Sequence, residues 1–215
     1  MHCNVVSVFD AYGHEMRIFL AGATGVIGVR LVPLLVASGH VVAGMTRSAS
    51  KEGLLRELGA EVVVCDVFEA DALLQNVVKF RPDMVIHELT DLPDDASRIR
   101  ESAAANIRIR EEGTRNLILA AEAAKSERFI AQSVAWELGG AGGRATSYLE
   151  SAVLAAGGVV LRYGQFYGPG TYHEFEIPEM PRIHIDEAAR RTVAALHEPS
   201  GIIDVVEDPS RKSLS

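Results

Sequence analysis

Residues 16–28 read MRIFLAGATGVIG, and this stretch decides the fold. An apolar run, Arg17–Ala21, has the composition of a buried strand and is followed by glycines at 22, 25 and 28, in the spacing G-x-x-G-x-x-G. Glycine permits a tight turn and lets backbone amides approach a ligand with no Cβ in between. A glycine turn between a first strand and a first helix is the context that a dinucleotide-binding loop requires. We therefore expect the amides and the positive end of this helix to hold a diphosphate.

Beyond this loop, short apolar runs alternate with helix-length segments. The runs are β-branched or apolar almost throughout, as in strands that helices cover on both faces. Strict alternation predicts an α/β protein with right-handed crossovers, a Rossmann-like doubly wound parallel sheet. The predicted strands are Arg17–Ala21, Val41–Met45, Glu61–Cys65, Met84–His87, Phe129–Gln132, Val159–Arg162 and Ile202–Val206. The predicted helices are Val26–Ser38, Lys51–Leu58, Ala70–Phe80, Ala96–Ala124, Thr146–Ala156 and Asp186–His197.

Composition excludes several classes of function. The 215 residues carry 21 basic and 29 acidic side chains, a formal net charge of −8, which argues against a general nucleic-acid binder. No apolar run reaches the roughly 20 residues that cross a bilayer, so no membrane partner is expected. The two cysteines, Cys3 and Cys65, make no disulfide framework and favour a cytoplasmic location. Residues 1–15 lack a clear period and are interpreted as an N-terminal extension, or else as an added edge strand through Val5, Val6 and Val8.

The end of the second strand bears on the choice of cofactor. An acid that binds the adenosine ribose 2′-hydroxyl normally stands there, about 20 residues past the glycines. This chain has Thr46 and Arg47 instead, and a guanidinium suits a 2′-phosphate, which favours NADP over NAD. The alternative is a solvated surface arginine. After the third strand, Asp66 can accept from the adenine amino group while Val67 packs on the ring, although Asp66 can equally cap the next helix.

Further motifs follow in a fixed order. They are the Asp66-Val67 pair, residues 106–121 (with Gly113-Thr114-Arg115-Asn116-Leu117), Gln132-Ser133, residues 161–170 (LRYGQFYGPG) and residues 184–189 (HIDEAA). With the glycine loop, they resemble the extended short-chain dehydrogenase/reductases, the NAD(P)-dependent epimerase/dehydratase family. The likeness runs from about Met16 to the C-terminus. It implies an NAD(P)-binding Rossmann domain over residues 16–170, whose ligand lies at the carboxyl ends of the strands.

The resemblance also implies where the site residues lie. Ser133, at the end of the fifth strand, corresponds to the family's substrate-polarising serine. The fourth strand's end borders the ribose and nicotinamide, although His87 is equally well read as a satisfied histidine at a strand end. The expected cofactor contacts are Gly22, Ala23, Thr24, Gly25, Val26, Ile27, Gly28, Thr46, Arg47, Asp66, Val67, His87, Glu88, Leu89, Gln132, Tyr163, Gly164 and Phe166.

The catalytic pair of the family is missing. Its tyrosine is pushed toward ionisation by a lysine four residues on, because a free phenol, with a pKa near 10, is a poor base at neutral pH. Here Tyr148 is followed at that spacing by Ala152, and no lysine occurs between Lys125 and Lys212. Ser133 and Tyr148 remain the catalytic candidates, with Arg144 as a nearby positive charge. No metal is expected, since the histidines and acids of residues 173–184 match no ligand spacing.

The family's substrate lobe is much reduced. Only thirteen residues separate Gly170 from His184, so residues 171–215 are expected to add a short loop, a helix and a strand to the same domain. The substrate is then small, or a partner subunit completes the pocket, or there is no turnover. Two functions are compatible with this: an oxidoreductase or epimerase-like enzyme using NADP on a small carbonyl or hydroxyl substrate, and a catalytically inactive NAD(P)-binding sensor. By family analogy, a homodimer would use the helices predicted at 96–124 and 146–156.

Overall fold

The computed structural model describes residues 15–93 and 95–208. At its centre is a seven-stranded sheet in the order β3-β2-β1-β4-β5-β6-β9, with every neighbouring pair parallel. The α/β class and the Rossmann-like doubly wound sheet predicted from the alternating pattern are confirmed. The strands are β1 (Arg17–Ala21), β2 (Val41–Thr46), β3 (Glu61–Val64), β4 (Met84–His87), β5 (Arg128–Val134), β6 (Val159–Tyr163) and β9 (Gly201–Val205).

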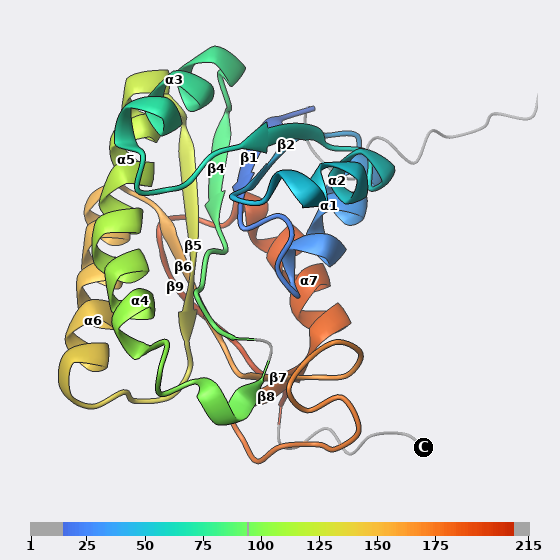
Figure 1. Ribbon diagram of the computed structural model, residues 1–215, viewed down its shortest axis with the longest axis vertical. Coiled ribbons are helices and arrows are strands. Elements are labelled where there is room, and N and C mark those ends of the chain that lie inside the picture. Colours follow the sequence, from blue (N-terminus) through green and yellow to red (C-terminus); the bar gives the residue numbers. More distant parts are fainter. Residues whose placement is uncertain (1–14, 94, 209–215) are drawn as a thin grey trace, which may run out of the picture.

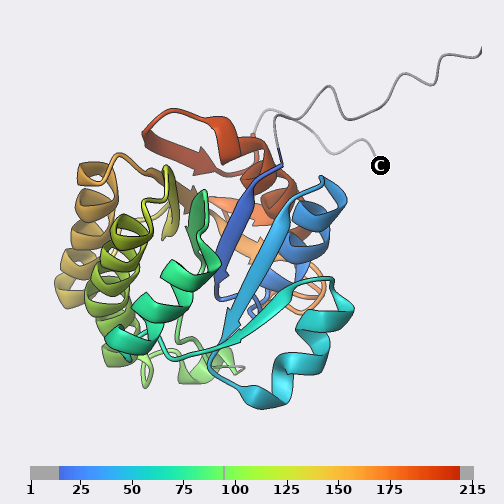
Figure 2. The ribbon, with the colours of Figure 1, turned by 90° about the horizontal axis from the view of Figure 1, so that it is seen from above.

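Helices cover both faces of this sheet (Figures 1 and 2). On one face lie α1 (Gly28–Ala37), α2 (Glu52–Glu57) and α7 (Ile185–Ala194), and on the other α3 (Ala70–Phe80), α4 (Ala103–Arg108), α5 (Thr114–Ala124) and α6 (Gly140–Ala155). Side chains alternate across each strand, so Leu20 packs toward α1 and Phe19 toward α3 and α5. Each fully buried side chain of this size contributes about 2–3 kcal/mol. Because the strands are apolar on both faces, each face of the sheet is covered by a layer of helices.

The predicted helix Ala96–Ala124 is wrong as a single element. It consists of a 3-10 turn, η3 (Ala96–Arg98), then α4, a π-helical turn, η4 (Ile109–Gly113), and α5. The Asp95 carboxylate accepts from the Ser97 amide at the start of η3, as an acid at a helix start should. Gly113 packs against Val67, where an added Cβ would lie 3.4 Å from a methyl carbon. A π turn shifts the helix by one residue, and such an insertion has no periodic signal in sequence.

Helix α6 begins earlier than predicted, at Gly140 instead of Thr146. The glycines at 140, 142 and 143 are therefore part of the helix. A Cβ at Gly143 would lie 2.0 Å from the Leu138 carbonyl oxygen, so the close approach of these two backbones requires glycine there. Two other glycines act as expected: Gly39 and Gly59 end α1 and α2 with φ values of 87° and 92°.

A small two-stranded parallel sheet, β7 (Gln165–Tyr167) with β8 (Arg182–His184), lies beyond the carboxyl ends of the main strands, at the bottom of Figure 1. Residues 168–181 connect these two strands. In the part of the chain described, none of the helices has the length and apolar character needed to span a membrane. The extension and its alternative edge strand lie almost wholly outside the described residues. Cys65 is buried and free, as a small core residue.

Candidate functional site

The glycine loop after β1 is a tightly packed backbone turn. Gly22 has a φ of 92°, and a Cβ there would lie 2.6 Å from the Glu88 carbonyl oxygen at the end of β4. A Cβ at Gly28 would lie 2.2 Å from the Gly22 carbonyl oxygen, so the start of α1 is pressed against the turn. A larger residue at either position must displace backbone, which explains why the sequence has glycine there.

This turn leaves a row of amides without an acceptor. The Ala23 and Gly25 amides donate to the carbonyl oxygens of Met45 and Gly22. Within residues 15–93 and 95–208, no hydrogen-bond acceptor faces the amides of Thr24, Val26, Ile27 and Gly28. They stand at the N-terminus of a ten-residue helix, where the dipole favours an anion. The loop therefore fits a dinucleotide diphosphate by its backbone alone.

At the end of β2, the residues expected to take the adenosine 2′-group are engaged with the protein. The Thr46 hydroxyl lies 3.2 Å from that of Thr24 and accepts from the Ser48 amide. Arg47 Nη2 donates to Asp91 Oδ1 at 2.7 Å, and this hydrogen bond raises the pKa of the guanidinium further. The two residues are 44 positions apart in the chain, so no local sequence pattern indicates this contact. The structure thus brings a carboxylate to the end of β2 from the loop after β4.

Asp66 and Val67 face inward from the end of β3. Asp66 Oδ1 accepts from the Phe68 amide at 3.0 Å, closing a turn ahead of α3. Val67 is buried, and its carbonyl oxygen accepts from the Asn116 side chain at 3.0 Å. These contacts give both residues a structural role, and the contact with adenine remains a prediction.

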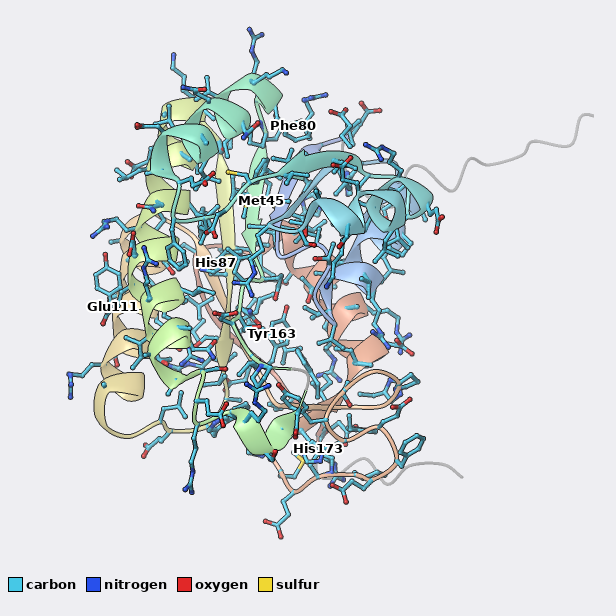
Figure 3. The ribbon with its side chains drawn as sticks, in the orientation of Figure 1. Met45, Phe80, His87, Glu111, Tyr163 and His173 are labelled. Atoms are coloured by element: carbon cyan, nitrogen blue, oxygen red, sulfur yellow. The ribbon has the colours of Figure 1, made fainter. Side chains whose placement is uncertain are left out.

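His87, at the end of β4, is a fully buried and fully partnered histidine. Its Nδ1 accepts from the Leu89 amide at 3.2 Å, so the proton sits on Nε2, which donates to Thr114 Oγ1 at 3.1 Å. Burial, and secondarily the charge of Arg110, lowers its pKa to about 4, so the ring is neutral. His87 therefore has the contacts of a satisfied histidine at a strand end, which was the alternative interpretation, and its contact with the cofactor remains a prediction. Figure 3 shows it between the two helical layers.

Glu88 and Tyr163 form a buried polar pair on the opposite face of the sheet. The Tyr163 hydroxyl lies 3.0 Å from Glu88 Oε1 and 2.6 Å from Thr192 Oγ1 of α7, while Glu88 Oε2 is buried with no partner in the described part of the chain. Burial raises the pKa of Glu88 to about 8, so the carboxyl is protonated at neutral pH. Tyr163 points into the core beside α7 (Figure 3), and the centroids of its ring and the Phe166 ring are 5.2 Å apart. Gly164, next along, passes against the Arg182 backbone.

Ser133 belongs to a charged cluster beneath α6. Its Oγ donates to Glu150 Oε1 at 2.6 Å, and Arg162 of β6 binds both oxygens of the same carboxylate, at 2.9 Å and 2.6 Å. Burial by itself would raise the pKa of Glu150, but the hydrogen bonds from Arg162 and Ser133 bring it below its ordinary value. Arg110 of η4 adds a further positive charge near this carboxylate. The group next to Ser133 is thus an ionised carboxylate.

Tyr148 is not brought to Ser133. It precedes Glu150 by two residues on α6, which places it about 200° around the helix from the side that meets Ser133. Its side chain is 41% exposed, whereas Leu149 is buried against the sheet. A signal for Glu150 was present, because it is the single acid of α6. Gln132 lies on the other face of β5 from Ser133, opposite Leu161 in register.

The segment between β7 and β8 is open and apolar at its tip. Phe175 is 95% exposed, and His173 Nδ1 lies 3.1 Å from Glu176 Oε1. Across residues 15–93 and 95–208, no three His, Cys, Asp or Glu side chains gather in a way that could hold a metal ion. Arg30 of α1 ties this region to the glycine loop, since it binds Asp186 at 2.8 Å and the Pro169 carbonyl oxygen at 2.5 Å.

Comparison with known proteins identifies the family. A family profile described as NAD(P)H-binding matches residues 22–155, from the glycine loop to the end of α6. The chain belongs to the NAD(P)H-binding family. As a family member, this NAD(P)H-binding protein is 34% identical over 236 aligned residues to a 3-diazoavenalumate denitrifying reductase of Streptomyces, covering 90% of this chain and 76% of the reductase. It is also 32% identical over 122 residues to the photosystem II assembly factor Ycf39 of Synechocystis, covering 55% of this chain and 34% of that protein.

Solved structures agree with the resemblance to extended short-chain dehydrogenase/reductases. The Bordetella bronchiseptica enzyme WbmG in complex with NAD matches with a TM-score of 0.71 and 18% identity, over 90% of this chain and 73% of that one. A UDP-glucose 4-epimerase of Thermotoga maritima matches with a TM-score of 0.73 and 19% identity, over 89% and 77%. The protein thus shares the fold of these enzymes, and its family is that of NAD(P)H-binding proteins.

Proposed function

We propose that this NAD(P)-binding protein is an oxidoreductase that prefers NADP and transfers a hydride to or from a small carbonyl or hydroxyl substrate. The observation that carries the proposal is the set of unpaired amides of Thr24, Val26, Ile27 and Gly28, in a loop whose Thr24 hydroxyl lies 3.2 Å from that of Thr46, the residue before Arg47. The 34% identity to a reductase supports redox chemistry over a purely structural role. The exposed apolar loop after β7, in place of a larger lobe, supports a small substrate.

Each part of the site has a distinct task in this proposal. The glycine-loop amides bind the diphosphate, and Arg47 with Thr46 binds a 2′-phosphate. The bound nicotinamide supplies or accepts the hydride. Ser133 orients the reacting oxygen of the substrate at the carboxyl end of β5. Because the Ser133 proton is directed to Glu150, its oxygen presents lone pairs that suit a substrate hydroxyl.

The Ser133–Glu150 contact also offers a route for the proton that accompanies hydride transfer. The route runs from the substrate oxygen through Ser133 Oγ to the carboxylate, which Arg162 keeps ionised. The Tyr148 side chain lies on the other side of α6, so no phenol takes part in this proton route.

The alternative is a catalytically inactive NAD(P)-binding sensor or regulatory module. The exposed position of Tyr148 and the alanine at the lysine's place, Ala152, favour it. In that case the glycine loop binds the dinucleotide, and the binding itself changes what the protein contacts.

The predicted homodimer remains a prediction, which light scattering of the purified protein tests.

Calorimetric titration with NADPH and NADH tests the proposal. We expect both to bind, NADPH more tightly, and Gly28→Ala to abolish binding, whereas Gly53→Ala, at a helical position with open space around it, serves as the matched control. A panel of small aldehydes and ketones is then added while NADPH absorbance is followed. Turnover supports the oxidoreductase, tight binding with none supports the module, and failure of both cofactors to bind overturns the proposal.

A further inference from the structure

The strand order places an ion pair across the glycine loop. In the sheet, β1 lies between β2 and β4, as Figure 1 shows. Arg47 follows β2 directly, and Asp91 lies four residues after the last residue of β4, yet Arg47 Nη2 and Asp91 Oδ1 are 2.7 Å apart. The pair therefore passes over the carboxyl end of β1, where the loop with unpaired amides begins. A dinucleotide whose diphosphate occupies that loop has its adenosine ribose beside this pair.

The two partners are held very differently. The backbone of Asp91 is clamped on both sides by one side chain of α4: its amide donates to Asn106 Oδ1 at 3.0 Å, and its carbonyl oxygen accepts from Asn106 Nδ2 at 3.0 Å. The Asp91 side chain is 28% exposed and that of Arg47 is 63% exposed. Asp91 is thus the fixed partner, and Arg47 is a long side chain that, among residues 15–93 and 95–208, makes a single hydrogen bond, which a stronger anion can replace.

We propose that Asp91 is the specificity-determining residue for the dinucleotide, because it competes with a 2′-phosphate for Arg47. This inference rests on the proposed binding of NAD(P) at the glycine loop. A 2′-phosphate must take Arg47 from Asp91 and then sits beside a fixed carboxylate that repels it. A 2′-hydroxyl instead donates to the Asp91 carboxylate and leaves the ion pair in place. Asp91 therefore supplies, from the loop after β4, the acid that the end of β2 lacks.

A second acid acts in the same direction. Asp66, after β3, also interacts electrostatically with Arg47, so the guanidinium already balances negative charge before any phosphate arrives. Arg47 by itself would make the site strongly selective for NADP, and the acids around it reduce that selectivity. The chain thus carries both elements of cofactor recognition, in the segments that follow β2 and β4, the strands on either side of β1.

Titration calorimetry of the full chain with NADPH and with NADH tests the role of Asp91. In Asp91→Asn we expect NADPH to bind about tenfold more tightly and NADH to bind equally or more weakly, since a charge-assisted contact on the hydroxyl is lost and a repulsive charge on the phosphate is removed. In Arg47→Gln we expect NADPH to bind at least about tenfold more weakly, with NADH little changed. Asp91→Ser provides a second variant in case the asparagine form folds poorly, which circular dichroism detects.

The matched control is Glu101→Gln. It removes the same charge from another exposed ion pair on the chain between β4 and α5, that of Arg98 with Glu101, which is far from β2 in the sequence and makes no contact with Arg47. Its ratio of NADPH to NADH affinity should equal that of the unchanged protein. If the unchanged protein binds both cofactors and the Asp91 variants keep its ratio within about twofold, the inference is overturned while the proposed function stands. If neither cofactor binds the unchanged protein, both are overturned.

Discussion

The Ser133 hydroxyl donates a hydrogen bond to Glu150 Oε1 at 2.6 Å, so the serine at the end of β5 is bound to an acid on α6. Arg162, on the neighbouring strand β6, binds the same carboxylate with two nitrogens. This arrangement joins two strands and a helix through one charged group. The cluster lies on the side of α6 that meets Ser133, whereas Tyr148 lies on the other side of the same helix.

Loss of the Glu150 carboxylate should destabilise the protein. Glu150→Ala leaves Arg162 and Ser133 without their partner in a mostly buried setting, and because Arg162 is partly exposed to water we expect a cost of about 1–2 kcal/mol, less than for a fully buried pair. Urea unfolding measures it. Glu112→Ala, which removes an exposed pair with Arg108, should cost much less, because water screens that pair. Equal costs for the two variants would contradict a special role for the cluster.

Substitution at Gly28 should damage the cofactor loop specifically. An alanine Cβ there would lie 2.2 Å from the Gly22 carbonyl oxygen, so the loop must move, at a cost of roughly 1–3 kcal/mol and with loss of dinucleotide binding. Gly53→Ala places a methyl group in open space on a helix and should stabilise by about 0.5–1 kcal/mol. Thermal unfolding measures the stability of the two variants, and calorimetry measures their dinucleotide binding. A Gly28→Ala protein that binds NADPH normally would refute this account of the turn.

The stability of the protein should depend on pH through Glu88. Its pKa is raised from 4.5 to about 8 by burial, so between these values the folded state keeps a proton that the unfolded state has lost. The free energy of unfolding therefore falls as pH rises across this window, by at most about 1.4 kcal/mol per unit, and levels off above it.

Glu88→Gln carries no titratable proton at this position and should lack this decline. Urea unfolding of both proteins at several values between about pH 5 and pH 8 measures the difference, which should grow with pH in favour of the glutamine variant. Glu112→Gln, at an exposed position, should follow the unchanged protein. Parallel curves for Glu88→Gln and the unchanged protein would show that Glu88 is ionised in the fold.

The Tyr163 hydroxyl should contribute to stability, and that of Tyr148 should not. Tyr163→Phe removes the group that bonds both Glu88 and Thr192 inside the core, at an expected cost of about 1–3 kcal/mol. Tyr148→Phe removes an exposed hydroxyl that makes no hydrogen bond within the described ranges, and should change stability by less than about 0.5 kcal/mol. Once a substrate is found, a large loss of turnover in Tyr148→Phe would show that this tyrosine reaches the site.

The strands and the glycine loop could be predicted because their signals are local. Arg17–Ala21 and Met84–His87 were predicted to the residue, since each is an unbroken apolar run beside turn-forming residues. The helix over 96–124 could not be resolved, because the π turn before Gly113 fits that glycine against Val67, a residue 46 positions earlier in the chain. Arg162 carried a weak signal, as a charged residue within an apolar strand.

The sequence by itself determined the alternation of strands and helices, the position of the glycine loop and the absence of the tyrosine–lysine pair, because these depend on residue type at short spacing. Only the tertiary structure decided which charges meet. Asp91 reaches Arg47 because β1 lies between β2 and β4, and Glu150 reaches Ser133 because α6 packs on β5. A parallel sheet gathers the ends of strands that are far apart in the chain. Pairing at that edge therefore depends on strand order and helix packing, which no local pattern records.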